Sequence, residues 1–154
     1  MVLIRPAVRQ DLLAIADLMD DLDRFYGGVD RGSRAERLNG IEEALFAESA
    51  SVYALLAWGQ SAIAGMAAYS FLWPAAGVSR SLYLKELYVV EQMRRAGVGG
   101  ALMTEIFRVA KSHRCSRVEW ATEVGNIDAQ QFYATLGATQ LDGKVSYRVV
   151  FSDH

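Results

Sequence analysis

The sequence predicts a single α/β domain over residues 1–154, with a central mixed, mostly antiparallel sheet flanked by helices. Two observations lead to this prediction: three consecutive strand-like segments in the middle of the chain, and a strand, helix and strand directly after them. A strand–helix–strand unit almost always forms a right-handed parallel crossover, so parallel and antiparallel pairing share one sheet. With 52% hydrophobic residues, 154 residues are enough to bury one core without a disulfide.

The N-terminal part of the chain predicts one strand and two helices. Residues 2–6 form the strand, and residues 10–26 follow with an apolar stripe at helical spacing. The stripe comprises Leu12, Ile15, Met19, Leu22 and Tyr26. Ser33, with Glu36 three residues later, is typical of a helix N-terminus, and the second helix continues to Phe46.

The middle of the chain predicts an antiparallel meander, then a helix and a parallel strand. The three meander strands are residues 52–58, 62–73 and 82–90, separated by a Gly-containing turn and a Pro-containing loop. A Gly-rich junction at residues 97–100 opens a helix that runs to His113. Residues 117–122 form the parallel strand that follows.

The C-terminal part predicts a helix and a β-hairpin. The helix begins at Asn126 or Asp128 and ends at Gly137. Asp142-Gly143 is a hairpin turn between strands at residues 138–141 and 145–151.

Composition excludes several classes of protein. The single cysteine, Cys115, cannot form an internal disulfide, and residues 1–9 lack the pattern of a secretory signal, so we expect a cytoplasmic protein. The apolar stretches are too short to cross a membrane, and no membrane partner is expected. Two histidines and one cysteine give no metal-ligand spacing, so we expect no metal. A net charge of −2 disfavours nucleic-acid binding.

The segment from Arg94 to Gly100 predicts an anion site. Glycines in the first turn of a helix leave backbone N–H groups unpaired and uncovered, and Arg94 and Arg95 precede them. Backbone donors, helix dipole and guanidinium groups all favour a phosphate or pyrophosphate. The dinucleotide pattern Gly-x-Gly-x-x-Gly fails because Leu102 occupies the last glycine position. The alternative is that the glycines only allow close packing at a strand-to-helix turn.

Two charged residues, Lys85 and Glu86, interrupt a strand that is apolar on both faces. Leu82, Leu84 and Tyr88 are expected on one face and Leu87 on the other, so the strand is central. One interpretation is that the charges pair with others or lie at a solvent-facing end. The other is that a carboxylate is held beside a cleft as a general base.

Two motifs resemble those of the GNAT superfamily of acyl-CoA-dependent N-acyltransferases. Residues 94–99, Arg-Arg-Ala-Gly-Val-Gly, resemble its Arg/Gln-x-x-Gly-x-Gly/Ala pyrophosphate loop. Residues 126–138 resemble its Asn-x-x-Ala-x-x-Phe-Tyr-x-x-x-Gly-Phe/Ala signature, and residues 4–7 its usual opening. Within the superfamily, residues 83–89 and 126–138 are most similar to the diamine (spermidine/spermine) acetyltransferases and their thialysine-acetylating relatives.

The resemblance implies an acetyl-CoA-dependent N-acetyltransferase with a cofactor site. The strand backbone at residues 87–89 would pair with the pantetheine arm, residues 94–100 would bind the pyrophosphate, and Asn126 would contact the arm. The expected cofactor-binding residues are Leu87, Tyr88, Val89, Arg94, Arg95, Ala96, Gly97, Val98, Gly99, Gly100 and Asn126.

The resemblance also implies two catalytic residues. Tyr133 matches the family's general acid, which protonates the departing thiolate, and its alternative is an ordinary aromatic beside Phe132. Glu86 is the candidate base that deprotonates the substrate ammonium, through water. The diamine enzymes usually have two adjacent acids here, whereas this chain has Lys85 first. A lysine ammonium would repel a polycationic substrate.

The expected reaction is acetyl transfer to a primary amine of a small molecule by direct attack in a ternary complex. The alternatives are acetylation of a protein or peptide amine, and a non-catalytic acyl-CoA-binding regulatory module. A homodimer is expected because dimerisation is common in the family and an edge strand at residues 145–151 would otherwise be unpaired.

Overall fold

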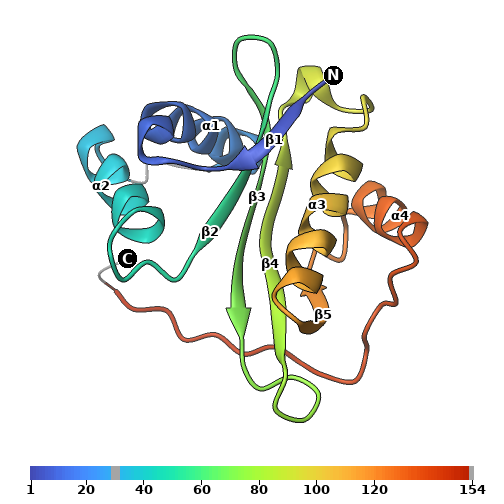
Figure 1. Ribbon diagram of the computed structural model, residues 1–154. Helices are drawn as coiled ribbons and strands as arrows, with labels where there is room; N and C mark the ends of the chain where they lie inside the picture. Colours follow the sequence, from blue (N-terminus) through green and yellow to red (C-terminus); the bar gives the residue numbers. More distant parts are fainter. Residues whose placement is uncertain (29–31, 153–154) are drawn as a thin grey trace. The chain divides into compact units, whose positions relative to one another are not determined.

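The computed structural model describes residues 1–28 and 32–152, in two compact units at residues 1–120 and 121–154. The first unit contains a five-stranded sheet in the order β1-β2-β3-β4-β5 (Figure 1). Its strands are β1 (Leu3–Pro6), β2 (Tyr53–Trp58), β3 (Ile63–Leu72), β4 (Arg80–Val89) and β5 (Cys115–Trp120). Its helices are α1 (Leu12–Phe25), α2 (Arg34–Leu45) and α3 (Val98–Ser112), with short 3-10 helices η1 (Arg9–Asp11) and η2 (Glu91–Met93).

Strand pairing confirms the predicted mixed, mostly antiparallel sheet. Strands β1 to β4 pair antiparallel with their neighbours, and β5 pairs parallel with β4 after the crossover through α3. Helices α1 and α2 lie on one side of the sheet in Figure 1 and α3 on the other. The α/β fold class is therefore confirmed, while the single-domain organisation stays a prediction.

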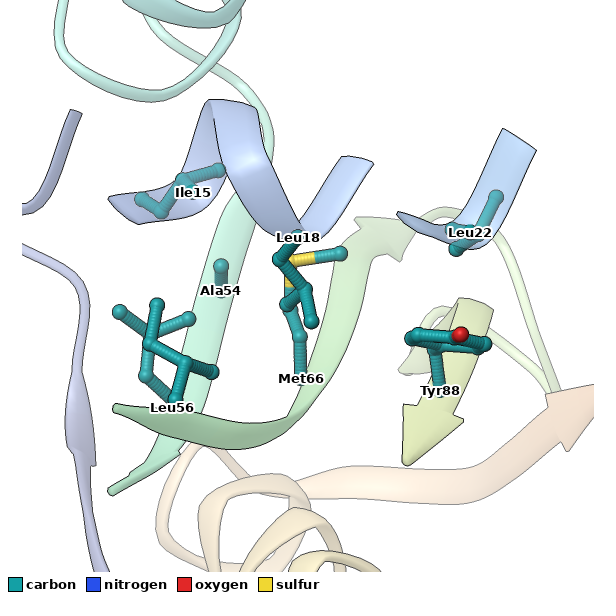
Figure 2. Packing of buried hydrophobic residues seen from close by; sticks show 8 residues of the cluster. Ile15, Leu18, Leu22, Ala54, Leu56, Met66 and Tyr88 are labelled. Carbon is teal, nitrogen blue, oxygen red and sulfur yellow. The ribbon is translucent and has the colours of Figure 1, made fainter. Parts of the chain in front are cut away.

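The two faces of the sheet pack against different helices. On the first face, Ile15, Leu18 and Leu22 of α1 contact a buried cluster that includes Met66 and Tyr88, as Figure 2 shows. On the second face, a Cβ added at Gly65 would lie 3.2 Å from Val98 and Leu102 of α3. Because side chains alternate along a strand, residues of β3 with even numbers near this point face α1 and those with odd numbers face α3.

A bulge in β4 corrects the predicted alternation of that strand. Tyr69 pairs with Leu84 and Ala68 pairs with Glu86, so Lys85 has no opposite residue in β3. An extra residue shifts the following side chains to the other face. Leu84 and Tyr88 therefore lie on opposite faces and not on one face as the sequence suggested.

Polar contacts hold the starts of α1 and α2. Asp11 is buried and accepts two hydrogen bonds from the Arg5 guanidinium, at 2.8 and 2.9 Å, and one from the Val8 N–H. The predicted cap of α2 is confirmed, because the Ser33 hydroxyl accepts a hydrogen bond from the Glu36 N–H at 3.1 Å.

The second unit contains one helix, α4 (Ile127–Thr135), which confirms the prediction of a helix there. The hairpin expected around Asp142-Gly143 is wrong, because residues 138–152 form no strand. Six large apolar side chains of this segment are exposed: Leu141, Val145, Tyr147, Val149, Val150 and Phe151. A two-stranded hairpin is marginal without a further strand or helix to cover its apolar face, and these exposed side chains have no such cover. Across residues 1–28 and 32–152, no helix is both long and apolar enough to span a bilayer.

Candidate active site

The second half of β4 has a free edge. Pairing with β5 ends where Leu84 meets Trp120, whereas pairing with β3 continues to Val89. On the β5 side, the part of the first unit that the structure describes offers no strand partner to residues 85–89. The two parallel strands separate at this point, so backbone groups along Leu87–Val89 can hydrogen-bond an extended ligand.

The N-terminus of α3 forms the predicted cradle directly after this edge. Gly97 adopts a left-handed conformation with φ of +83°, which a residue with a Cβ rarely adopts, and its carbonyl accepts from the Ala101 N–H at 3.0 Å. The N–H groups of Val98, Gly99 and Gly100 come before the first N–H that donates within the helix, so no carbonyl of the helix accepts from them. Open space lies where a Cβ would be at Gly97 and Gly100. The cradle can therefore accept a phosphate without a clash from its own side chains.

Arg94 uses its side chain differently from the expectation of a phosphate ligand. Its Nε donates to the Val89 carbonyl at 2.9 Å, and its guanidinium carbon lies 4.3 Å from the ring centroid of Phe25 and 5.6 Å from that of Tyr88. Arg94 thus ties the cradle loop to the end of α1. Arg95, with a positive φ of 63°, is exposed.

Glu86 lies on the α1 face, two residues before Tyr88 and beside the free edge. Burial raises the pKa of its carboxyl above the ordinary range, while the Lys85 ammonium and a hydrogen bond with Tyr26 act in the opposite direction. A half-buried carboxylate with a raised pKa is a better proton acceptor than an exposed one. Its place beside the edge where an acyl donor could bind favours the general-base interpretation.

Two residues of this region were missed by sequence reasoning, namely Asp21 and Tyr26. The buried Tyr88 hydroxyl donates to Asp21 Oδ2 at 2.5 Å, and burial together with Asp21 raises the pKa of Tyr88 to about 12. Tyr26 hydrogen-bonds Glu86. Both pairs join the C-terminal end of α1, including its C-cap Tyr26, to β4. The sequence marks Glu86 as a charged residue in an apolar strand, but it carries no local signal for these partners, because Tyr88 and Asp21 lie 67 positions apart.

The other acidic residues of α1 are paired with arginines. Arg37 donates to Asp20 and Asp23, and Arg34 donates to Asp17 and Asp20, at distances of 2.7–3.0 Å. These residues therefore form an ion-pair network between α1 and α2. Asp30 lies outside the described residues.

The second unit holds the remaining predicted site residues. Asn126 caps α4, because its Oδ1 accepts from the Ala129 N–H at 3.1 Å, and its amide nitrogen is a further donor group. Tyr133 lies on α4 with its ring 5.4 Å from that of Phe132. Gly137 has a φ of +77° at the end of the helix, as its predicted role in stopping the helix requires.

Two other features lie away from these residues. A shallow pocket of 310 Å³ between α3 and β5 is lined mainly by apolar atoms, with Lys111, Ser116 and Arg117 at its polar side. Burial raises the pKa of the Cys115 thiol in its wall, which disfavours the reactive thiolate. Within residues 1–28 and 32–152, no group of three His, Cys, Asp or Glu side chains could hold a metal ion.

Comparison with known proteins identifies relatives with this fold. Residues 15–138 match the acetyltransferase (GNAT) family. The thialysine N-epsilon-acetyltransferase of Sus scrofa is 29% identical over 156 residues, which cover 96% of this chain and 91% of that protein. The match extends across nearly the whole of both chains.

Solved structures agree with the family match. An integron cassette protein from the mobile metagenome of V. cholerae superposes with a TM-score of 0.89 at 28% identity, covering 98% of this chain and 93% of the other. An aminoglycoside N-acetyltransferase in complex with CoA superposes with a TM-score of 0.77 at 20% identity, covering 97% and 95%. The second likeness supports the fold alone.

Proposed function

Because the chain belongs to the acetyltransferase (GNAT) family and is an N-acetyltransferase, we propose that it transfers the acetyl group of acetyl-CoA to a primary amine of a small molecule. The observation that carries the proposal is the half-buried Glu86 beside a free strand edge that leads into the α3 cradle. A relative named for thialysine supports a small amine.

The chain's own residues bind the donor in this proposal. Backbone groups of Leu87, Tyr88 and Val89 hydrogen-bond the pantetheine amides along the free edge, as a strand partner would. The unpaired N–H groups at residues 97–100 and the exposed Arg95 bind the pyrophosphate, with Arg94 and Ala96 shaping the loop. The amide of Asn126 contacts the arm.

Glu86 acts as the base. The acceptor arrives as an ammonium, which has no lone pair, and Glu86 removes one proton through a water molecule. The neutral amine attacks the thioester carbonyl carbon directly, a C–N bond forms, and the tetrahedral intermediate loses its C–S bond. The nitrogen then loses one of its two remaining protons, and this proton replaces, through water, the one that Tyr133 gives to the sulfur. The products are the N-acetyl amide, which keeps one N–H, and CoA as the thiol.

Tyr133 acts as the acid in the same step. Its hydroxyl donates a proton to the sulfur as negative charge develops there, because CoA leaves more readily as a thiol than as a thiolate. Tyr133→Phe should lower kcat while the affinity for acetyl-CoA is kept. Tyr147→Phe, an exposed tyrosine of the same unit, is the matched control.

The proposal is tested by release of the CoA thiol from acetyl-CoA with a panel of amines, alongside calorimetric binding of acetyl-CoA. We expect amine-dependent thiol release that Glu86→Gln lowers by about a hundredfold or more, with binding retained. Glu91→Gln, at an exposed carboxylate in η2 two residues after the strand ends, is the control. If acetyl-CoA binds and the CoA thiol is released with peptides but with none of the small amines, the result would instead support a protein acetyltransferase. Binding with no transfer at all would support a regulatory module.

A cytoplasmic homodimer is part of the same proposal. The exposed apolar side chains of residues 145–151 favour burial against a second copy. Cys115 has no disulfide partner in the chain, as is usual in a reducing compartment. Light scattering of the purified protein should give twice the mass of the chain. A monomeric mass would overturn the dimer and leave the acetyltransferase proposal intact.

A further inference from the structure

Three groups at the ends of β4 and α1 hold the side chain of Arg94. Its Nε donates to the Val89 carbonyl at 2.9 Å, and its guanidinium lies within cation–π distance of the rings of Phe25 and Tyr88. The centroids of these two rings are 5.9 Å apart, and the Tyr88 hydroxyl donates to Asp21. Turning the guanidinium towards a phosphate would give up the hydrogen bond and both ring contacts. The position of Arg94 therefore favours a role within the protein over one at the phosphates.

The Val89 carbonyl that Arg94 binds lies on the free edge of β4. Val89 is opposite Gly65 in the antiparallel pairing of β3 and β4. The neighbouring hydrogen bond runs from the Val90 N–H to the Ala64 carbonyl, at 2.9 Å. In such a ladder the N–H and C=O of Val89 therefore point away from β3. Because pairing with β5 ends earlier in β4, Arg94 occupies the last carbonyl of the edge along which the donor would bind.

We propose that Arg94 is a positioning residue for the acyl donor, which fixes the end of the free β4 edge and does not bind the pyrophosphate. The inference rests on the proposed function. With the Val89 carbonyl already paired, a ligand that adds to the edge like a strand meets the Val89 N–H and, two residues earlier, the N–H and C=O of Leu87. The pantetheine arm then has one register, and the exposed Arg95 is the guanidinium left for the phosphates.

Two ligands separate the arm of the donor from its phosphates. Pantetheine carries the arm and the thiol but no phosphate, whereas CoA carries both. We expect Arg94→Met to weaken the binding of both ligands by about tenfold, because the ligand must order an edge that has lost its hydrogen bond. Arg95→Met is the matched variant at the next position and should change the ratio of the two affinities by about tenfold, at the expense of CoA. Calorimetry measures the binding of CoA, and NMR titration of the backbone amides measures that of pantetheine.

The amide signals give a readout that a general loss of structure would not move in the same way. In the wild type, saturating pantetheine should shift the amides of Leu87 and Val89. In Arg94→Met the shift at Val89 should fall while that at Leu87 is kept, because only the end of the edge has lost its hydrogen bond. Thermal unfolding of each variant checks that it is folded.

Phe25→Leu tests the same contact from the side of α1. The Phe25 ring is 51% exposed, so its replacement should leave the protein folded. Loss of the cation–π contact should weaken both ligands by about threefold, and by less when Arg94 is already replaced by Met. Leu13→Ala, at another exposed apolar position of α1, is the control and should leave both affinities unchanged. Additive effects of Phe25→Leu and Arg94→Met would contradict the proposal.

The outcomes separate this inference from the function on which it rests. If Arg94→Met weakens CoA but not pantetheine, Arg94 binds the phosphates; if it tightens pantetheine, its side chain competes with the arm. Either result overturns the inference and leaves the proposed donor site standing. If the wild type does not bind CoA, or if pantetheine leaves the amides of residues 87–89 unshifted, the donor site and the inference both fail. The measurements need no acceptor, so an amine panel without a substrate does not affect them.

Discussion

The two faces of the sheet are held in different ways. Helix α3 packs through apolar side chains, and Leu102, Met103 and Ile106 are completely buried. Helices α1 and α2 add a polar layer to their apolar contacts. This layer consists of the Arg5–Asp11 pair, the Tyr88–Asp21 hydrogen bond and the ion pairs of Arg37.

The face that packs against α3 positions the cradle, and the face that packs against α1 carries the candidate base. The apolar face holds the α3 N-terminus, and hence the cradle, at a fixed place after β4, because close-packed apolar contacts leave little freedom. The polar face presents Glu86, whose pKa depends on burial and on its neighbours. Substitutions on the α3 face should therefore change mainly stability, and those on the α1 face should change charge, pH dependence or specificity.

Leu102→Ala should have the largest effect on stability. The substitution removes a completely buried side chain from the α3 face and leaves a cavity, which we expect to lower the free energy of unfolding by about 3 kcal/mol. Urea unfolding followed by circular dichroism measures the change. Leu13→Ala, at an exposed position of α1, is the control and should cost less than about 1 kcal/mol. Equal losses for the two variants would contradict the importance of apolar packing under α3.

Asp11→Asn should have a smaller effect that depends on pH. Arg5 holds the pKa of Asp11 below its usual range, so the stabilisation is complete above about pH 4, the unfolded value, and is lost as pH falls through the folded pKa. At neutral pH we expect a loss of about 2 kcal/mol, measured by urea unfolding.

The wild type and Asp11→Asn should converge in stability as the solution is acidified from pH 5 to pH 2. Asp17→Asn, at a carboxylate that is 74% exposed, is the control and should change stability little at any pH. A gap between wild type and Asp11→Asn that stays constant across this range would show that the pair does not titrate as described.

Tyr88→Phe should cost about 1 kcal/mol, because it removes one hydrogen bond from the α1 face without changing the buried ring. A double-mutant cycle with Asp21→Asn isolates the interaction, and we expect a coupling energy of similar size. Tyr83→Phe on the same strand is the control for the loss of a hydroxyl. Additive effects of Tyr88→Phe and Asp21→Asn would mean that the two side chains do not interact in solution.

The sequence predicted the fold class and the glycine-containing start of α3 because local signals were strong. Alternation, turn residues and the Ser33 cap located most of the elements of the first unit, and the glycines of the cradle followed from backbone requirements. The C-terminal hairpin was wrong because strand formation depends on what covers the strand, and residues 138–152 remain exposed.

Local sequence patterns could not predict the bulge in β4 or the tyrosine–carboxylate pairs. A bulge is defined by the register between two strands, and the change from Leu84 to Glu86 depends on how β3 pairs with β4. The Tyr88–Asp21 contact joins residues 67 positions apart, so no periodicity contains it. The sequence could identify Glu86 as unusual but could not identify its neighbours.

The smallest effect expected is a shift of the pH profile in Lys85→Gln. Glu86 must be ionised to accept a proton, so kcat/KM falls as pH drops through its pKa. The Lys85 ammonium lowers this pKa, and its removal should move the acid limb of the profile to higher pH. Lys85→Arg keeps the charge and should keep the limb. The profiles are compared at saturating acetyl-CoA. The acceptor is n-butylamine, which carries no charged group besides the reacting amine, so that no second acceptor charge contributes to the pH dependence. A limb that does not move, or that moves to lower pH, would mean that Glu86 is not the titrating base or that Lys85 does not act on it.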